Sequence, residues 1–343
     1  MQESKRLETI GNIKVLMMLA VVLYHSCMFF SGNWFDGAQP VYQAPYLYIV
    51  ARWLNTFHVQ TFTMASGFLF YYLCKEKGRY KNFKNDVLKR AKRLLLPYFL
   101  VIITWALPFY VYYSGANLEK IIYKYVLGCA PSQLWFLPML FLLFVVFYEI
   151  LRKDRVSTTG MAVVALISIG GGYLLDKAGF NVFQIAMAFK YAGYYYFRAY
   201  ICKVGKEFKK ILLPISVVGS VAFFAISYTA EITTNGPAWF RMLGLLSVYL
   251  SSYMGILMIY MSCALRNENR KETKIKIWDI LKEKSFGIYL FHQQVIYLTI
   301  MWLNGRVHPV LQVCLSFVLA ITLASIITAI LQRFKLTKTL YGV

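Results

Sequence analysis

Apolar residues are grouped along the chain into long runs that are separated by short polar segments. A helix that crosses the roughly 30 Å hydrocarbon layer of a membrane needs about 20 such residues. The pattern therefore predicts an all-α, polytopic membrane bundle of about ten transmembrane helices, which forms a single domain over residues 1–343. The predicted spans are 13–31, 53–74, 94–113, 132–151, 159–175, 181–201, 211–228, 241–265, 285–304 and 309–332.

The basic residues alternate with these runs. Of the 37 lysines and arginines, 30 lie in every second connecting or terminal segment and 7 lie elsewhere. Positive residues mark the cytoplasmic side of a membrane protein, and an even number of spans puts both termini on one side, so we expect both termini in the cytoplasm. The basic segments are 1–14, 75–93, 152–155, 198–210, 266–284 and 333–343.

Composition supports a membrane location and excludes other classes. The chain is 59% hydrophobic and only 15% charged, whereas a soluble domain carries roughly 25% charged residues. The net charge of +22 is explained by topology and by anionic lipid headgroups, so no nucleic-acid partner is expected. The six cysteines have no paired spacing, which predicts neither a disulfide framework nor a zinc site. The first apolar run is followed by no small-residue cleavage site and is interpreted as a retained span.

Two ionisable residues lie on the first predicted span. Lys14 and His25 are 11 residues apart, a spacing that puts both on one helix face, roughly 16 Å apart. A buried neutral imidazole is able to act as a general base. The alternative is a lysine that extends to the membrane surface and a histidine that is bonded to a backbone carbonyl. The spacing alone leaves both interpretations open.

A second polar group lies on the ninth predicted span. Ser285, Tyr289 and His292 occupy positions i, i+4 and i+7 and therefore share one helical stripe. They are either a hydrogen-bonded catalytic chain or ordinary polar contacts between helices.

Two further sites lie at the ends of predicted spans. Arg90 and Arg93 share one helix face, and paired guanidinium groups suit phosphate oxygens, although basic residues beside a span are also what topology requires. Trp135 opens the fourth span and has the position of an interfacial anchor. His58 and His308 also look interfacial, and His308 has no evident role.

These sites together resemble the acyltransferase-3 family of integral membrane O-acyltransferases. Five motifs occur in the family's order. They are Lys14 followed by the run Val21-Val22-Leu23-Tyr24-His25, the segment Phe62–Leu69, the pair Arg90 and Arg93 followed by Leu95-Leu96-Pro97-Tyr98, the segment Leu134–Pro138, and the segment Ser285–His292.

The resemblance implies roles for several residues. His25 corresponds to the family's catalytic histidine, and Lys14, Arg90 and Arg93 to its residues for the acyl-CoA donor. Trp135 and Ser285 match further functional positions. This chain has Lys14 where the family usually has arginine, and Gly11 where it often has an acidic residue; Glu8, one turn earlier, is a possible substitute.

The expected activity is transfer of an acyl group, acetyl in the simplest case, from acyl-CoA to a hydroxyl of a cell-envelope, lipid-linked or exported glycan. His25 is the expected general base, with Ser285, Tyr289 and His292 as further candidate catalytic residues. Tyr289, Ser285 and Trp135 are the candidate oxyanion donors, and a relay through acyl-histidine stays open. No metal is expected. The expected surroundings are the lipid and glycan of a bacterial cytoplasmic membrane.

Two other classes remain. A polar stripe through ten helices also fits a transporter of a glycan or small polar solute, although the chain has no internal repeat of the kind that transporters often show. Lys14 and Gly11, which depart from the family pattern, also fit a scaffold without activity.

Overall fold

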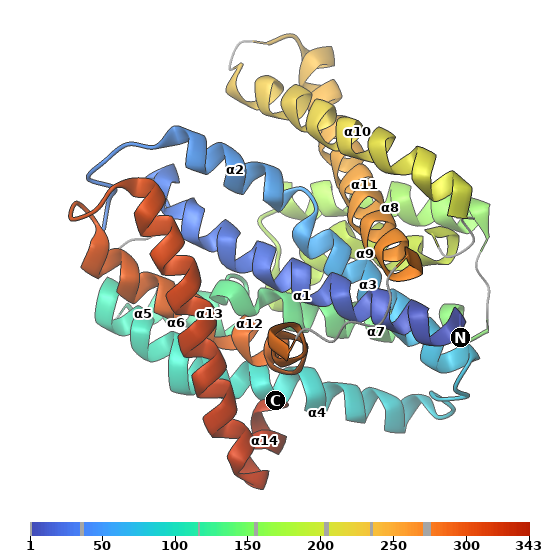
Figure 1. Ribbon diagram of the computed structural model, residues 1–343, viewed down its shortest axis with the longest axis horizontal. Coiled ribbons are helices and arrows are strands. Elements are labelled where there is room, and N and C mark those ends of the chain that lie inside the picture. The colour runs from blue at the N-terminus through green and yellow to red at the C-terminus, as the bar shows by residue number, and fades with distance from the viewer. Residues whose placement is uncertain are drawn as a thin grey trace.

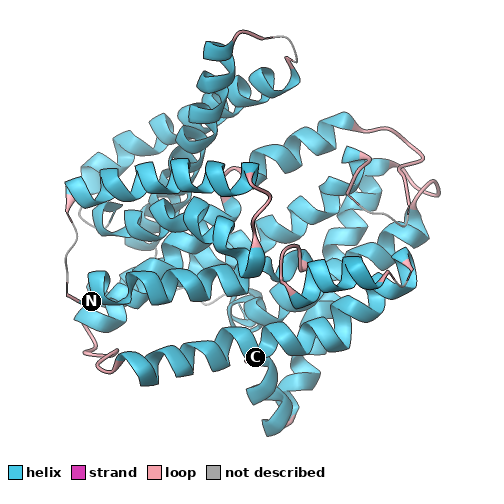
Figure 2. Cartoon of the chain, turned by 180° about the vertical axis from the view of Figure 1, so that it is seen from behind, coloured by secondary structure: helices cyan, strands magenta, loops and turns pink. Residues whose placement is uncertain are grey.

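The computed structural model describes residues 2–34, 38–115, 117–153, 157–201, 206–233, 236–269 and 276–343. Four of the basic segments, 1–14, 152–155, 198–210 and 266–284, fall partly outside these ranges, and Cys202 falls outside them entirely. Within them the chain forms helices and no strand (Figure 2), as the sequence predicts. The α-helices are α1 Gln2–Met28, α2 Pro45–Asn55, α3 His58–Lys75, α4 Phe83–Val101, α5 Leu107–Ser114, α6 Leu118–Ile121, α7 Phe136–Arg152, α8 Thr158–Lys177, α9 Ile185–Ile201, α10 Lys206–Ile232, α11 Ala238–Asn269, α12 Lys276–Leu303, α13 Pro309–Arg333 and α14 Lys335–Tyr341.

Eight of the helical segments within these residues are long and apolar enough to cross a membrane. They correspond to eight of the ten predicted spans. The other two predicted spans correspond to α3 and α9, which are 18 and 17 residues long and pack against each other. The eight segments are Arg6–Ser31, Phe83–Ser114, Ser132–Arg152, Thr159–Lys177, Glu207–Ile232, Ala238–Glu268, Lys276–Leu303 and Pro309–Arg333.

The second predicted span is wrong at its start, because the chain turns there. The expected helix over 53–74 is divided between α2 and α3. Phe57 leaves the helical conformation with φ −136°, and the Thr56 hydroxyl donates to the Trp53 carbonyl at 2.8 Å, which closes the end of α2. The turn places His58 at the first position of α3, where it is buried.

Helix α1 lies in the middle of the bundle (Figure 1) and packs against α2, α3, α11, α12 and α13. Its apolar side chains contribute to two hydrophobic clusters. Met18 and Val22 belong to one, with residues of α7 and α12, and Ile13 and Met17 to the other, with residues of α3 and α11. The two candidate residues of α1, Lys14 and His25, therefore lie on a helix that is packed into both hydrophobic clusters.

Glycine allows two of the closest helix contacts. A Cβ at Gly67 would overlap the Tyr195 carbonyl of α9, and a Cβ at Gly287 would overlap the Thr328 side chain of α13. Since small residues let helix backbones approach each other, these two positions determine how closely α3 meets α9 and α12 meets α13.

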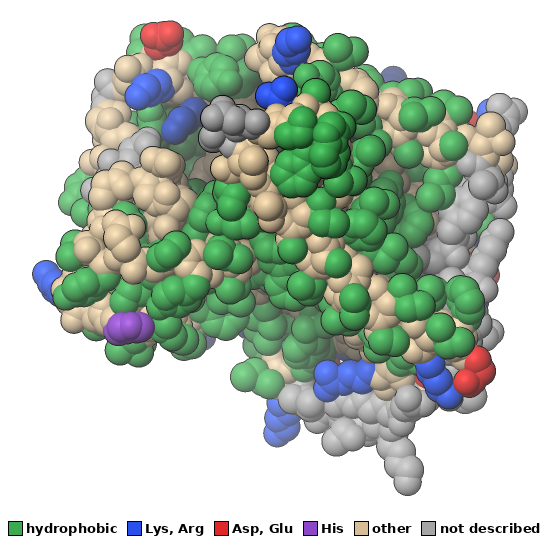
Figure 3. All heavy atoms as spheres, turned by 90° about the horizontal axis from the view of Figure 1, so that it is seen from above, with side chains coloured by type: hydrophobic (Ala, Val, Ile, Leu, Met, Phe, Trp, Pro, Cys, Tyr) green, Lys and Arg blue, Asp and Glu red, His purple; other side chains and the backbone are tan. Residues whose placement is uncertain are grey.

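The outer surface is predominantly apolar. Apolar side chains cover most of the face in Figure 3, and the charged ones lie toward its margins. Exposed side chains such as Val218, Leu246 and Leu166 lie on helices that are long enough to span a bilayer. This is the surface of a multi-pass membrane protein, whose apolar side chains face lipid.

Candidate active site

His25 lies near the end of α1 and lines a cavity of about 440 Å³, here called the histidine cavity. Its ring is 5.5 Å from the Trp34 ring and 5.1 Å from the His292 ring, measured between centroids. Its Nδ1 is buried and has no hydrogen-bond partner among the residues that the structure describes. The imidazole therefore lines a cavity and does not face lipid. It is also not bonded to a described backbone carbonyl, so the alternative interpretation of this histidine does not hold.

His292, on α12, is fully buried against His25. Its Nδ1 donates to the Ile288 carbonyl at 3.0 Å and to the Tyr289 carbonyl at 2.8 Å. These bonds place the proton on Nδ1, so Nε2 carries the lone pair. Nε2 has no partner in the described part of the chain.

The predicted cationic residues line a second cavity, of about 360 Å³, here called the basic cavity. Lys14 comes from α1, and Arg90 and Arg93 come from α4. The Arg90 guanidinium lies over the Phe144 ring, 5.2 Å from its centroid, and its buried Nε has no hydrogen-bond partner within the described ranges. None of the three cations forms an ion pair with a described carboxylate. Lys282 and Glu283 also line the cavity, so its described charged lining residues are four cations and one carboxylate, and the cavity carries net positive charge.

Arg90 and Arg93 also line a third cavity, of about 520 Å³, which opens beside the segment that connects α3 and α4. Gly78 and Tyr80 both have positive φ values there, +60° and +65°. The Tyr80 ring packs against Phe70 at 4.8 Å. This loop cavity also presents the exposed cationic side chains of Arg79, Lys81 and Lys89.

The basic and histidine cavities meet at three shared lining residues, namely Phe62, Phe136 and Tyr289. The Phe136 ring lies 5.9 Å from the Phe62 ring and 6.1 Å from the Tyr289 ring. These rings form an aromatic partition between the two cavities. The cationic residues and His25 thus lie on opposite sides of one layer of side chains.

The hydroxyl groups of α12 do not form the hydrogen-bonded chain that their spacing allows. Ser285 donates to its own helix at the Lys282 carbonyl, 3.0 Å away, and Tyr289 donates to the Gln133 carbonyl at 2.5 Å. Tyr289 therefore links α12 to the turn before α7, which is a contact between segments. Both hydroxyls use their one proton within the protein.

Trp135 lies inside the bundle and not at its surface. It is half-buried, lines the histidine cavity and packs against Tyr191 at 5.4 Å between ring centroids. Its indole N–H makes no hydrogen bond to a described residue. Of the three candidate oxyanion donors, it is the one whose proton is not already committed.

The far wall of the histidine cavity contains a cluster of side-chain amides that the sequence analysis missed. Gln184 donates to the Gly128 carbonyl at 2.6 Å and Asn181 donates to the Cys129 carbonyl at 3.1 Å. The side-chain oxygens of Asn181 and Gln293 are buried without a donor among the described residues. Two acceptor oxygens therefore line this wall without a partner.

Backbone strain marks the same wall. Ser132, Phe183 and Gln184 have φ values of +56°, +50° and +64°, a region that residues other than glycine rarely adopt and that often accompanies functional sites. Cys129 lines the cavity too, but burial raises the pKa of its thiol. The protonated form is therefore favoured, and Cys129 is poorly suited to be a nucleophile.

The remaining sequence candidates are also placed. His58 is buried, lines the histidine cavity and donates from Nδ1 to the Leu54 carbonyl at 2.7 Å, so its interfacial assignment is wrong. His308 caps α13 by accepting from the Val310 N–H at 3.3 Å. Glu8 is exposed and does not line the basic cavity, so it does not take the place of an acidic residue at Gly11.

The fold and the cavities define a class of protein, a multi-pass helical membrane protein with a polar site inside the bundle. The chain belongs to the acyltransferase-3 family, whose model, described as an acyltransferase domain, matches residues 8–329. This confirms the family to which the sequence motifs point, and membership implies acyl transfer in a membrane. No curated protein and no solved structure matches the chain.

Proposed function

We propose that this protein transfers an acyl group, acetyl in the simplest case, from acyl-CoA to a hydroxyl of a cell-envelope or exported glycan. The observation that carries the proposal is the contact between the two cavities. A cavity with net positive charge meets the cavity of His25 at the aromatic partition formed by Phe62, Phe136 and Tyr289.

The donor side is argued from charge. The phosphates of acyl-CoA are polyanionic, and guanidinium groups bind them through charge-assisted hydrogen bonds. Arg90 and Arg93 line both the loop cavity and the basic cavity, so the nucleotide would lie in the loop cavity. The pantetheine arm would then extend past Lys14 toward the partition. Both termini and this end of the bundle would face the cytoplasm, where acyl-CoA is found.

The reaction requires a base at the acceptor hydroxyl. In the proposed step the hydroxyl oxygen attacks the thioester carbonyl and His25 takes the hydroxyl proton. The C–S bond then breaks, and the CoA thiolate leaves and takes up a proton. His292 would act as a positioning residue, because its ring packs against the His25 ring and its Nε2 has a free lone pair. An acyl-histidine relay leads to the same products, with two transfers in place of one.

Trp135 would supply the oxyanion donor. The tetrahedral intermediate carries negative charge on the former carbonyl oxygen, and a preorganised N–H stabilises that charge. Trp135 lines the histidine cavity together with His25. Tyr289 and Ser285 would serve in structural roles, since their hydroxyl protons are bonded to backbone carbonyls.

The acceptor side favours a sugar. The lining of the histidine cavity offers the unpartnered oxygens of Asn181 and Gln293 and the indole ring of Trp34. Carbonyl oxygens accept from sugar hydroxyls, and aromatic rings supply the apolar surface on which a sugar ring packs. The acceptor would enter from the end of the bundle opposite the loop cavity, in a bacterial cytoplasmic membrane.

The test is acyl transfer by the purified protein in lipid vesicles. Labelled acetyl-CoA and a panel of glycans are supplied, and label is followed in CoA, glycan and vesicle lumen. Transfer to a glycan that requires His25 supports the proposal. Solute uptake without consumption of acetyl-CoA would instead identify a transporter, and neither activity would identify a scaffold. Both results would contradict the proposal.

A further inference from the structure

A fourth cavity, of about 220 Å³, continues the histidine cavity on the side away from the partition. The two share Trp34, Ala130, Ser132 and Gln293 as lining residues. Six of its thirteen lining residues are aromatic, and we call it the aromatic cavity. Its aromatic residues are Trp34, Phe109, Tyr110, Tyr113, Tyr125 and Tyr297.

Among the residues that the structure describes, Lys124 is the one charged residue that lines the aromatic cavity. It lies on a π-helical turn, Ile122–Val126, and is half-buried. Its ammonium lies 4.4 Å from the centroid of the Tyr110 ring. The ring attracts the cation through its quadrupole but does not neutralise it.

Two of the six other basic residues that lie outside the basic segments have described carboxylate partners. The Lys190 ammonium lies 2.7 Å from an Asp176 carboxylate oxygen, and Arg52 pairs with Glu231. Lys124 has no such partner among the residues that the structure describes. A half-buried charge in an aromatic cavity loses hydration, so an anion that enters the cavity recovers electrostatic stabilisation there.

We propose that the aromatic cavity binds a negatively charged group of the acceptor, a sugar carboxylate or phosphate, and that Lys124 holds it. This inference rests on the proposed function and names the acceptor class as an acidic glycan. Trp34 connects the two subsites, because its ring lies 5.5 Å from His25 and 5.1 Å from Tyr297. The acidic group and the reacting hydroxyl would then lie on opposite sides of the Trp34 indole.

The test measures acceptor binding without acyl-CoA, in phosphatidylcholine micelles, by saturation-transfer NMR titration. Three matched pairs are compared, namely glucose with glucuronate, galactose with galacturonate, and glucose with glucose 6-phosphate. At least one acidic member should bind about tenfold more tightly than its neutral partner, the gain expected of a charge-assisted hydrogen bond. Lys124→Met should remove this preference and Lys124→Arg should keep it. The control Lys120→Met, which changes an exposed lysine that lines none of these cavities, should leave it unchanged.

Three results of the binding experiment would overturn the inference. One is equal binding within every pair, and another is a preference that survives Lys124→Met in protein with an unchanged unfolding temperature. The third is loss of the preference when phosphatidylglycerol replaces phosphatidylcholine, which would assign Lys124 to a lipid headgroup. Acyl transfer to neutral and acidic glycans with equal kcat/KM would contradict this inference and leave the proposed function intact. Acid-selective binding without acyl transfer would contradict the proposed function and leave the binding of an acidic group by Lys124 intact.

Discussion

The imidazole rings of His25 and His292 lie 5.1 Å apart between centroids and are inclined at 63°. The proton of His292 is fixed on Nδ1 by two backbone carbonyls of its own helix. The His292 Nε2 lone pair is therefore free to accept a hydrogen bond, and the adjacent His25 ring carries an N–H that could donate it. A small rotation of either ring toward such a bond would leave the other His25 nitrogen facing the cavity as a base.

This relationship predicts different effects for the two histidines. His25→Ala should lower kcat by about 10²–10⁴-fold, the usual contribution of a general base. His292→Asn should lower kcat by a smaller factor and leave KM for acyl-CoA unchanged, because it affects the orientation of the base and not donor binding. Both constants are measured by the release of free CoA.

His308→Asn is the matched control, since asparagine also caps a helix and His308 lies outside the cavities. It should retain full activity. A fall in kcat for His308→Asn as large as that for His292→Asn would mean that histidine loss acts through folding, and full activity in His25→Ala would remove the base assignment.

The basic cavity predicts a change in KM. Arg90→Ala and Arg93→Ala should each raise KM for acyl-CoA about tenfold, because each removes charge-assisted hydrogen bonds to phosphate, while kcat changes less. Lys92→Ala removes the same charge from the same helix at an exposed position outside the cavities, and its KM should stay near that of the unchanged protein. Equal KM values for Arg93→Ala and Lys92→Ala would contradict a docking role for the arginine pair.

The sequence predicted the helical class, most of the long helices and some of the residues that line the two cavities, such as His25, Lys14 and Arg90. It succeeded there because long apolar runs have few alternatives to membrane helices. Placing an ionisable residue such as His25 within such a run also costs enough free energy that its presence indicates a functional site. The membrane orientation and the count of ten spans remain predictions.

What the sequence could not supply depends on contacts between distant segments. Trp34 and Asn181 are an aromatic and a polar residue in short connections, and nothing in their spacing shows that they line the same cavity as His25. His58 looked interfacial because the predicted helix over 53–74 continues past it, whereas the turn at Phe57 places it inside. The hydrogen-bonded chain expected of Ser285, Tyr289 and His292 does not form for a related reason. Each of these side chains donates to a backbone carbonyl and not to another member of the chain.

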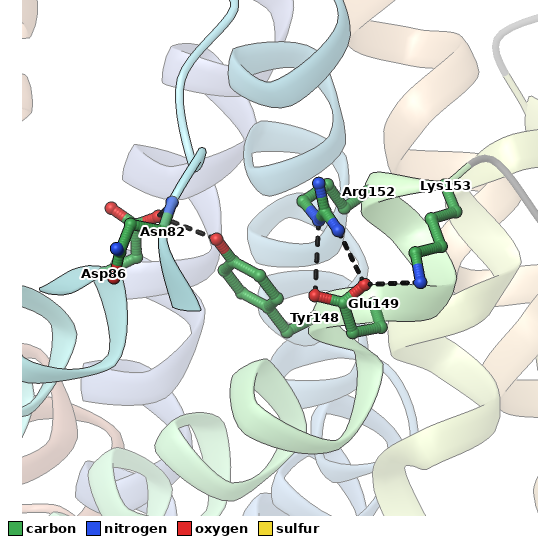
Figure 4. Close-up of polar contacts among 6 residues, drawn as sticks. All are labelled: Asn82, Asp86, Tyr148, Glu149, Arg152 and Lys153. Atoms are coloured by element: carbon green, nitrogen blue, oxygen red, sulfur yellow. Dashed lines mark hydrogen bonds and ion pairs between the residues drawn. The ribbon is translucent and has the colours of Figure 1, made fainter. Parts of the chain in front are cut away.

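A buried hydrogen bond supports the loop cavity and predicts a loss of stability. Tyr148 donates to the Asp86 carboxylate at 2.7 Å, and the same carboxylate oxygen accepts from the Asn82 N–H at 3.1 Å (Figure 4). Tyr148→Phe leaves the buried carboxylate short of one donor, which costs about 1–3 kcal/mol. The unfolding temperature in detergent should fall. KM for acyl-CoA should rise, because Asp86 holds the loop that carries the cationic side chains.

The next residue provides the control for Tyr148→Phe. Glu149 pairs with Arg152 at 2.8 Å and with Lys153 at 3.2 Å on the exposed side of α7 (Figure 4). Exposed ion pairs contribute little to stability, so Glu149→Gln should change neither the unfolding temperature nor KM. If the two variants behave alike, the buried hydrogen bond does not stabilise the loop.

Close packing of α12 on α13 gives a prediction of stability alone. Gly287→Ala should destabilise the protein by about 1–3 kcal/mol, because its Cβ would overlap the Thr328 side chain in a tightly packed interface. Gly170→Ala, on α8, adds the same methyl group where nothing lies within 4 Å and should leave the unfolding temperature unchanged or raise it. Thermal unfolding in detergent compares the two, and equal stability would show that α12 and α13 are less closely packed than described.

The aromatic partition predicts selectivity for the acyl chain. The acyl group of the donor would have to pass Phe62, Phe136 and Tyr289 to reach His25, so the size of this passage should limit the length of the chain. Phe136→Ala removes the ring that contacts both of the others and should raise the kcat/KM of butyryl-CoA relative to acetyl-CoA by about tenfold, since a difference of one or two methylenes is worth this much in a fitted pocket. Phe141→Ala, which removes a ring from the same helix away from the cavities, should leave the ratio unchanged. A ratio that stays constant in Phe136→Ala, in protein that still transfers acetyl groups, would mean that the acyl group reaches His25 by another route.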